Sequence, residues 1–389
     1  MPHYVQAYNN LGVIYKDSNK YENAIEMFTK ATEIQPDHQN SYYNLALIKK
    51  EQGIVEEALK LLLKVLDINP EHNEANFLHG LISITIDNFK EGWKYFEYRW
   101  KVSPGNKTIW PFQDKLVWKG ERGKRVVLWK EQGIGDQIIF LSLVREVKAM
   151  CRSLSVYVDP RLHSMCRRTM PEIHFVKDTE DLQQIECDFH LPIQSIGGLL
   201  RNDISDFDRT VNGYLKADPQ RVDAIRDELK LDGKTVIGIS WKSFNTRYKT
   251  KSVQLRDMER MFMGLDVVLV NLQYGDVDDE IRAFKEETGI DVLQCASVDN
   301  REDLDGLAAL IEACDLVIST SNVTVHMAGA LAKETWVMLH HVSIYYWLLE
   351  RTDSVWYPSL TLYRQPALND WDSVFSNINK NLQIKLYQI

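Results

Sequence analysis

A polar turn between an apolar run and a small-residue helix pattern is the strongest chemical signal in the sequence. The segment from Asp315 to Leu339 reads DLVISTSNVTVHMAGALAKETWVML, and its polar turn is Ser319–Asn322. Such a turn lies at the carboxyl end of a strand and the amino end of a helix, where N–H groups and the helix dipole favour an anion. The segment predicts a phosphate-bearing ligand. His326 could reach that phosphate or be a packed, hydrogen-bonded histidine.

A second candidate turn is Lys130 to Gln137, KEQGIGDQ, which follows an apolar strand and opens a helix. Gly133 and Gly135 let the backbone pass close to a ligand. Asp136 could act there as a general base that takes a proton from an acceptor hydroxyl. The alternative is that Asp136 is an N-cap with a purely local role.

A basic loop leaves a later strand at ISWKSFNTRYKTKS, Ile239 to Ser252. Its cations are Lys242, Arg247, Lys249 and Lys251. They could neutralise a diphosphate and offset charge on a leaving group, or form a solvated basic loop.

The segment NLQYGDVDDE follows the next strand. Its Gln273 and Tyr274 could contact a base or ribose, although a turn explains Gly275 and Asp276 equally well. No His, Cys, Asp or Glu cluster has the spacing of a metal site, so we expect no metal ion.

These motifs lie in a region of alternating strands and helices. Strands are predicted at residues 125–129, 154–158, 187–193, 236–241 and 267–272, and helices at 138–147, 221–229, 278–287 and 304–313. The alternation favours parallel sheets covered by helices. Its two blocks, 124–215 and 234–365, predict two doubly wound domains that face a cleft.

The amino-terminal part is a repeat with a period of 34 residues. Tyr8, Leu11, Ala24 and other positions recur 34 residues later, and prolines follow both copies at 36 and 70. The period and the small/large alternation are those of tetratricopeptide repeats. A third, decayed copy starts near Asn76. The alternative is an ordinary helical bundle.

Bulk properties limit the class of protein. The 389 residues suggest two or three domains, and the net charge of −9 argues against nucleic acid as a partner. The five cysteines are scattered, as in a reducing compartment. No apolar run approaches the roughly 18 residues of a membrane span. We expect a cytoplasmic protein, either free or peripheral at the inner membrane.

The motifs GIGDQ, GISWKS, LQYGD and DLDGLAALIEACDLVISTSNVTVHMAGALAK, with SVWYPSLTLYRQP, resemble glycosyltransferase family 9, the lipopolysaccharide heptosyltransferases. The chain looks most like bacterial proteins that fuse tetratricopeptide repeats to such a domain. The resemblance implies a GT-B fold, with two Rossmann-like domains facing a cleft. It also implies an inverting, metal-independent sugar transfer from a nucleotide-activated donor, with no further cofactor.

The resemblance also assigns roles to residues. The family's catalytic aspartate falls on Asp136, beside an acceptor-side loop of Gln132, Gly133 and Gly135. Its phosphate-binding lysine is best matched by Lys251, with Lys242 and Lys249 as rivals. The remaining donor-side residues are Gln273, Tyr274, Ser321, Asn322, Val323, Thr324 and His326. Many members carry Asp-Thr where this chain has Ser321-Asn322, so the family's donor is not carried over.

We therefore predict a glycosyltransferase with a nucleotide-sugar donor and a glycan, lipid-linked glycan or protein acceptor. The repeats would bind a protein partner or a second copy. The predicted parts are repeats at 1–102, a linker at 103–123, an acceptor domain at 124–216, a donor domain at 217–365 and a tail at 366–389 that packs back on the amino-terminal half. The alternatives are a non-catalytic repeat scaffold and a sugar-nucleotide epimerase.

Overall fold

The computed structural model describes residues 2–102, 111–112, 114–231, 233–243 and 251–387. The chain divides into two compact units, each of which is discontinuous in sequence. The first unit contains Met1–Thr108, Arg201–Ile204 and Val342–Leu349, and the second contains Ile109–Leu200, Ser205–His341 and Glu350–Ile389. The two short segments of the first unit were predicted to lie in the α/β domains, so those domain bounds are corrected here.

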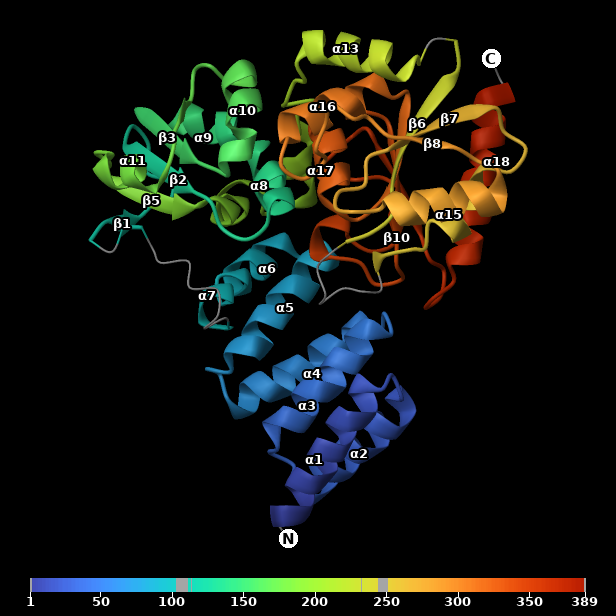
Figure 1. The fold of residues 1–389 in the computed structure, drawn as a ribbon. Helices are drawn as coiled ribbons and strands as arrows, with labels where there is room; N and C mark the ends of the chain where they lie inside the picture. Colours follow the sequence, from blue (N-terminus) through green and yellow to red (C-terminus); the bar gives the residue numbers. More distant parts are fainter. Residues whose placement is uncertain (1, 103–110, 113, 232, 244–250, 388–389) are drawn as a thin grey trace. The chain divides into compact units, whose positions relative to one another are not determined.

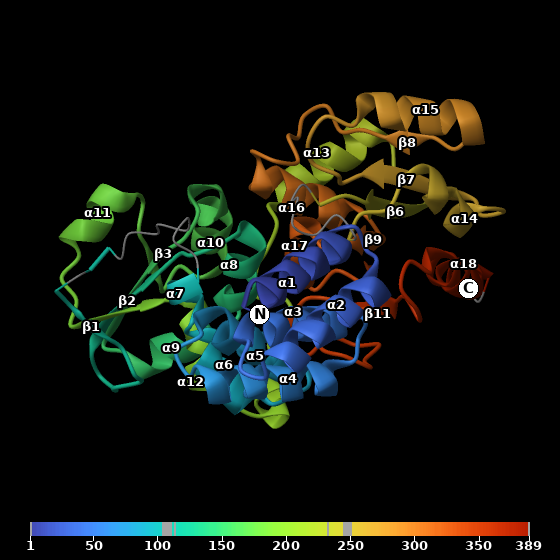
Figure 2. The same ribbon diagram turned by 90° about the horizontal axis from the view of Figure 1, so that it is seen from below.

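The first unit is a stack of helical hairpins (Figures 1 and 2). Its helices are α1 (Pro2–Asp17), α2 (Tyr21–Ile34), α3 (Gln39–Glu51), α4 (Val55–Ile68), α5 (Asn73–Thr85), α6 (Phe89–Phe96) and α7 (Arg99–Val102). Helices α1 to α6 pair in sequence order. The decayed third repeat is therefore a real hairpin, α5–α6.

Small residues allow these helices to approach closely. Ala24 and Ala58 are fully buried at equivalent positions of the first two hairpins. In the third hairpin, a Cβ at Gly80 would lie 2.7 Å from the backbone nitrogen of Phe96. The small/large pattern in the sequence thus follows from helix packing, as predicted.

The second unit contains two parallel sheets, and each sheet with its helices is called a lobe here (Figure 1). In the first lobe the strand order is β1-β5-β2-β3-β4. The strands are β1 (Leu116–Val117), β2 (Arg125–Trp129), β3 (Ser153–Tyr157), β4 (His174–Phe175) and β5 (Phe189–Pro192). The helices are α8 (Ile134–Leu141), α9 (Val144–Met150), η1 (Pro160–Leu162), α10 (His163–Thr169), α11 (Thr179–Gln184), η2 (Ile193–Ile196) and α12 (Gly197–Leu200), followed by η3 (Ile204–Arg209).

In the second lobe the strand order is β11-β10-β9-β6-β7-β8, with every pair parallel. The strands are β6 (Thr235–Ser240), β7 (Val267–Asn271), β8 (Val292–Leu293), β9 (Leu316–Thr320), β10 (Thr335–Leu339) and β11 (Leu360–Arg364). The helices are α13 (Pro219–Leu229), η5 (Arg256–Met258), α14 (Glu259–Phe262), α15 (Asp278–Thr288), α16 (Leu304–Ala313), α17 (Val323–Ala330) and α18 (Trp371–Tyr387). The first strand of the block, β6, lies between β9 and β7. The predicted architecture of repeats followed by two parallel α/β sheets is confirmed.

Two predicted parts differ from the structure. Within the predicted linker, β1 pairs with β5 as an edge strand. The predicted tail was also misplaced, because α18 packs on the second lobe and not on the amino-terminal half. Its Phe375 and Ile378 share a core with Ile318 of β9, and Asn379 Nδ2 donates to Met261 O at 2.9 Å. The apolar face of α18 therefore completes the cover of the second sheet.

Candidate active site

The carboxyl ends of β6, β7 and β9 meet at one edge of the second sheet. The register pairs Ser240 with Ser319 and Ile239 with Asn271. The three polar segments that the sequence analysis selected leave the sheet at this edge. Ligands of open parallel sheets bind outside such an edge.

The side chain of Gln273 joins two of these loops by hydrogen bonds. Its Oε1 accepts hydrogen bonds from Ser240 Oγ, Trp241 N and Lys242 N at 3.0, 2.9 and 2.8 Å. Its Nε2 donates to Tyr274 O at 3.1 Å, and the residue is 1% exposed. The prediction that Gln273 contacts a base or ribose is therefore corrected: its side chain holds the loop. Tyr274 is partly exposed, and its contact with a base or ribose stays a prediction.

Asn322 is the N-cap of α17, and its side chain also joins two of the loops by hydrogen bonds. Its Oδ1 accepts from Thr324 N at 2.9 Å, and its Nδ2 donates to Ser240 Oγ at 2.7 Å and Lys242 O at 3.1 Å. The backbone N–H of Thr324, predicted to hold the diphosphate, is thus engaged by the cap. Ser321 is buried as well, and Val323 is the partly exposed residue of the predicted turn.

Replacing Asn322 with Asp is expected to destabilise the protein by about 2–4 kcal/mol. The carboxylate keeps the cap but removes both Nδ2 donors, and it faces the carbonyl oxygen of Lys242 in a buried position. Chemical denaturation measures the loss. The same change at exposed Asn212 in the same unit should stay within about 0.5 kcal/mol of the parent. Equal losses at both positions would contradict the role of the two donors.

The turn between β2 and α8 shapes the first lobe's side of the site. Gln132 is in the left-handed region with φ 55°, and Gly133 is the N-cap of α8. Asp136 is the third helical residue, and its Oδ2 accepts from Gly133 N at 3.2 Å. The N-cap interpretation of Asp136 was therefore wrong. The hydrogen bond fixes a partly exposed carboxylate at the start of the helix.

Gly135 packs directly against His326 of the second lobe. A Cβ at Gly135 would lie 2.7 Å from His326 Cδ2, closer than real Cβ contacts. His326 cannot easily move, because it is 3% exposed and its Nδ1 lies 3.1 Å from Tyr357 Oη. The glycine-bearing motif and the histidine-bearing motif are thus in contact although they lie far apart in sequence.

The contact predicts a steric effect with a matched rescue. Gly135→Ala is expected to cost about 1–3 kcal/mol, because the added methyl group overpacks the His326 ring. When Gly135→Ala is added to the His326→Ala variant, which lacks the ring, it should cost less stability than it does in the parent protein. Denaturation of all four proteins gives the coupling energy. Strictly additive losses would show that the methyl group and the ring do not meet.

Burial raises the pKa of Asp136 from 3.8 to about 6. The hydrogen bond from Gly133 N and the positive charge of Lys251 act in the opposite direction, whereas the negative charge of Glu131 raises the pKa further. Glu131 is itself buried, and its Oε1 accepts from Gln194 N at 3.2 Å. Asp136 is therefore a carboxyl that titrates close to neutrality, as a general base requires.

His326 is held neutral. Burial and, to a smaller extent, the positive charge of Lys251 lower its pKa from 6.5 to about 3. Tyr357 is also stacked on Tyr214, with ring centroids 6.5 Å apart, and Tyr214 Oη donates to Ile138 O of α8 at 2.7 Å. This chain of contacts joins the motif histidine to the helix that carries Asp136.

Lys251 is the candidate lysine whose charge acts on both Asp136 and His326. It is 5% exposed. Lys242 Nζ is instead paired with Glu280, and Lys249 lies outside the described residues. The charge of Lys251 thus acts on Asp136 and on His326, and His326 contacts Gly135, the residue before Asp136. Tyr274 and Val323 are partly exposed and stay predicted donor-side residues, whereas the side chains of Gln273, Asn322 and Thr324 form hydrogen bonds within the loops.

Two contributors were not selected from sequence. Glu131 lies within KEQGIGDQ, but only Gln132, Gly133, Gly135 and Asp136 of that motif were predicted to contribute to the site. Tyr357 lies in the motif SVWYPSLTLYRQP, to which no site residue was assigned. Its neighbour Trp356 packs against Phe140 of α8, with ring centroids 5.4 Å apart, and the Tyr357 hydroxyl forms the hydrogen bond with His326. No local sequence pattern predicts that a tyrosine 31 residues after His326 forms this hydrogen bond.

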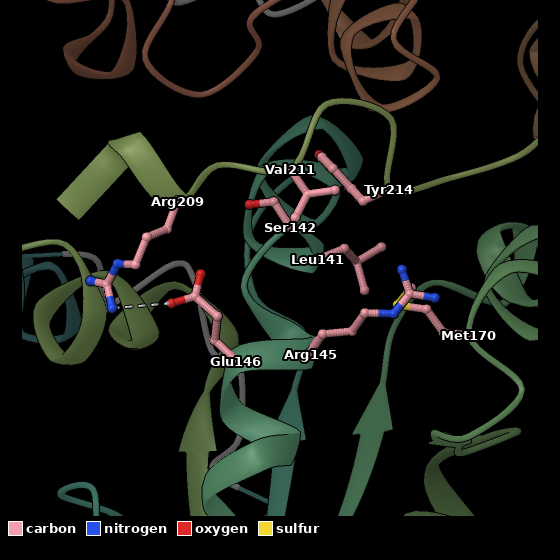
Figure 3. A pocket seen from close by; sticks show the side chains of 8 residues that line it. All are labelled: Leu141, Ser142, Arg145, Glu146, Met170, Arg209, Val211 and Tyr214. Atoms are coloured by element: carbon pink, nitrogen blue, oxygen red, sulfur yellow. Dashed lines mark ion pairs between the residues drawn. The ribbon is translucent and has the colours of Figure 1, made fainter. Parts of the chain in front are cut away.

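A pocket of about 250 Å³ opens beside the far end of α8 (Figure 3). It is lined by Leu141, Ser142, Arg145, Glu146, Met170, Arg209, Val211 and Tyr214. Its arginines are neutralised: Arg145 pairs with Glu172 at 2.9 Å, and Arg209 pairs with Asp206 at 2.7 Å. The pocket therefore lacks the net positive charge that would favour a diphosphate.

Within the described ranges, no three His, Cys, Asp or Glu residues gather as a metal-binding group. Among the helices of that same part of the chain, none has the length and apolarity of a membrane span.

Comparison with known proteins identifies the repeats. The tetratricopeptide repeat model matches residues 5–38 and again residues 39–72. The first unit therefore contains two tetratricopeptide repeats. The third hairpin, α5–α6, continues their geometry.

The chain is 30% identical over 325 residues to protein FlbA of Caulobacter vibrioides. The matched region covers 78% of this chain and 54% of FlbA. It thus spans about half the length of this curated relative.

Solved structures of two glycosyltransferases also match. The family 9 glycosyl transferase of Veillonella parvula has a TM-score of 0.47 and 10% identity over 69% of this chain and 99% of its own. The ADP-heptose lps heptosyltransferase II of E. coli has a TM-score of 0.48 and 10% identity over 68% of this chain and 99% of its own. These likenesses are weak, so the fold stands on the strand order and register described above.

Proposed function

We propose that the chain is a glycosyltransferase that moves a sugar from a nucleotide-diphosphate donor to a hydroxyl group. The proposal is supported by the contact of His326 with Gly135, next to Asp136, and by the effect of the Lys251 charge on Asp136 and His326. A base, a buried cation and a polar helix start are the groups that a sugar transfer from a diphosphate requires.

Asp136 is the general base of this proposal. Above pH 6 its carboxylate is ionised and can accept the proton of an acceptor hydroxyl. The oxygen then attacks the anomeric carbon from the face opposite the diphosphate. One displacement inverts that carbon, and no covalent enzyme intermediate is needed.

Lys251 stabilises the departing diphosphate. Its burial keeps its charge in a low dielectric, where it acts more strongly on a nearby anion than it would in water. The start of α17 adds its dipole at partly exposed Val323. Neutral His326 contributes hydrogen bonding and shape but no charge. The proposed mechanism uses no metal ion.

The repeats of the first unit serve recruitment in this proposal. Hairpins of this type bind partner segments along their surfaces. A protein acceptor or a protein partner would be held there while the second unit performs the transfer. We place the reaction in the cytoplasm, with the acceptor either soluble or at the inner face of the membrane.

A thermal-shift panel of nucleoside diphosphates and their sugars tests the proposal first. A ligand that binds the folded protein must raise its melting temperature. The best donor is then incubated with hydroxyl acceptors, with and without EDTA, and the products are separated. Transfer with inversion that survives EDTA supports the proposal. An altered donor sugar without an acceptor would indicate an epimerase, and absence of any nucleotide binding would indicate a scaffold.

A further inference from the structure

A short series of hydrogen bonds leads from helix α8 to the ring of His326. Tyr214 Oη donates to Ile138 O of α8 at 2.7 Å. The hydroxyl of Tyr214 also forms a side-chain hydrogen bond with Tyr357, whose ring is stacked on its own. Tyr357 Oη in turn lies 3.1 Å from His326 Nδ1. All three side chains are buried, so these hydrogen bonds restrict where their protons can lie.

The direction of each hydrogen bond follows from the number of protons. A tyrosine hydroxyl has one proton, and the carbonyl oxygen of Ile138 can only accept. The proton of Tyr214 is therefore used at Ile138, and the hydrogen bond between the two hydroxyls must be donated by Tyr357. Tyr357 has no second proton for His326. Its oxygen therefore accepts from Nδ1–H of the histidine.

The other ring nitrogen of His326 then carries a lone pair. A neutral imidazole has one N–H, so protonation of Nδ1 leaves Nε2 as an acceptor. The ring atoms nearest Gly135 are Cδ2 and Nε2, which would lie 2.7 and 3.3 Å from a Cβ at that glycine. Nε2 is thus on the side of the ring that faces the turn before Asp136.

The charge of Lys251 favours the same tautomer. It acts on the ring of His326 as well as on Asp136. An ammonium group has three donors and no acceptor. A lone pair on Nε2 is attracted by such a cation, whereas an N–H on that nitrogen would be repelled by it.

We infer that Tyr357 and Tyr214 are positioning residues that hold His326 as its Nδ1–H tautomer and so present Nε2 as a hydrogen-bond acceptor beside the turn before Asp136. The role of this nitrogen in sugar transfer rests on the proposed function. There, Nε2 accepts from a hydroxyl or ammonium group, and it cannot donate to an oxygen of the diphosphate.

Nitrogen-15 NMR of the full chain with labelled histidine measures the tautomer without any ligand or assay of transfer. The signals of His326 are those that are lost in His326→Gln or, if that variant does not fold, in His326→Asn. At pH 7.5 the ring is neutral, and the parent is expected to show a protonated Nδ1 and an unprotonated Nε2. A parent with a protonated Nε2 would overturn the inference.

Tyr214→Phe tests the series of hydrogen bonds itself. Without the Tyr214 oxygen, the proton of Tyr357 loses its acceptor and can be donated to Nδ1, which moves the histidine proton to Nε2. The population of the Nε2–H form is expected to rise about tenfold, the effect of one neutral hydrogen bond. The matched control is Tyr363→Phe, which removes a hydroxyl that accepts from Asn381 Nδ2 at 2.8 Å in the same unit. It should leave the His326 signals unchanged, and equal signals in the two variants would contradict the inference.

The kcat for sugar transfer tests the role of the tautomer. Tyr214→Phe is expected to lower kcat about 10–100-fold, as for outer partners that orient metal-bound histidines, and Tyr363→Phe should stay near the parent. A changed tautomer with an unchanged kcat would show that Nε2 has no role in transfer. The inference and the proposed function fail separately: a parent with protonated Nδ1 but no transfer contradicts only the function, and transfer by a parent with protonated Nε2 contradicts only the tautomer.

Discussion

Replacing Asp136 with Asn is expected to reduce sugar transfer by about 10²–10⁴-fold, the usual contribution of a general base. The amide has nearly the same shape, and its oxygen can still accept the hydrogen bond from Gly133 N. What it cannot do is accept the proton of the acceptor hydroxyl. The measurement is kcat with saturating donor, on protein whose circular dichroism matches the parent.

The same variant is expected to be more stable than the parent at neutral pH. Burial raises the pKa of Asp136 from 3.8 to about 6, so the folded protein disfavours the ionised carboxylate. Between these values the folded state binds more protons than the unfolded state, and this group's contribution to stability falls as pH rises. Above pH 6 the penalty is complete and amounts to about 1–3 kcal/mol after allowance for partial exposure.

Denaturant titrations at several pH values measure this difference. The stability gain of Asp136→Asn should be about zero below pH 4 and largest above pH 6. A catalytic group that destabilises the fold is the expected trade-off at an active site. If the variant were less stable than the parent at pH 7.5, the carboxylate would be structural, and its loss of activity would have to be ascribed to misfolding.

The pH profile of the parent reports the same carboxyl. Because the base must be ionised, kcat/KM should fall on the acid side of about pH 6. The negative charge of Glu131 raises the pKa of Asp136. Glu131→Gln should therefore move the acid limb to lower pH, while its side-chain oxygen can still accept from Gln194 N. If the acid limb of the pH profile did not move, ionisation of Asp136 would not be its cause.

Long, periodic elements could be predicted from the sequence. Helix α16 was predicted over the residues it occupies, and the strand, turn and helix of β9–α17 followed from the apolar run, polar turn and small-residue pattern. Strands β1, β4 and β8 have two residues each, too few for any alternation to register. The placement of α18 depends on which sheet face lacks cover, which is a property of the folded core.

The position of the candidate site could be predicted from the sequence, but the roles of its individual residues could not. Polar residues after parallel strands gather at one edge, so the position of the site followed from topology. Whether such a side chain faces a ligand or a neighbouring backbone depends on its contacts. The side chains of Gln273 and Asn322 join loops, whereas the charge of Lys251 acts on the carboxyl of Asp136. Spacing alone treats these residues alike.

Replacing Lys251 with Met is expected to lower kcat by about 10²–10³-fold, as for loss of one buried charge-stabilising group. The leaving diphosphate would lose its compensating cation, while the apolar stem would keep the packing. The positive charge of Lys251 also lowers the pKa of Asp136. The acid limb of the pH profile should therefore move to higher pH in this variant, which an effect on donor binding alone would not produce.

The matched control is Lys242→Met, at the second candidate lysine in the same basic loop. Lys242 is already neutralised by Glu280, so its loss should cost far less in kcat and leave the acid limb in place. Lys251→Arg keeps the charge and should restore the limb even if the altered geometry leaves kcat reduced. If Lys242→Met were the more damaging change, the diphosphate would lie on the Glu280 side of the loop. The role proposed for Lys251 in the displacement would then be wrong.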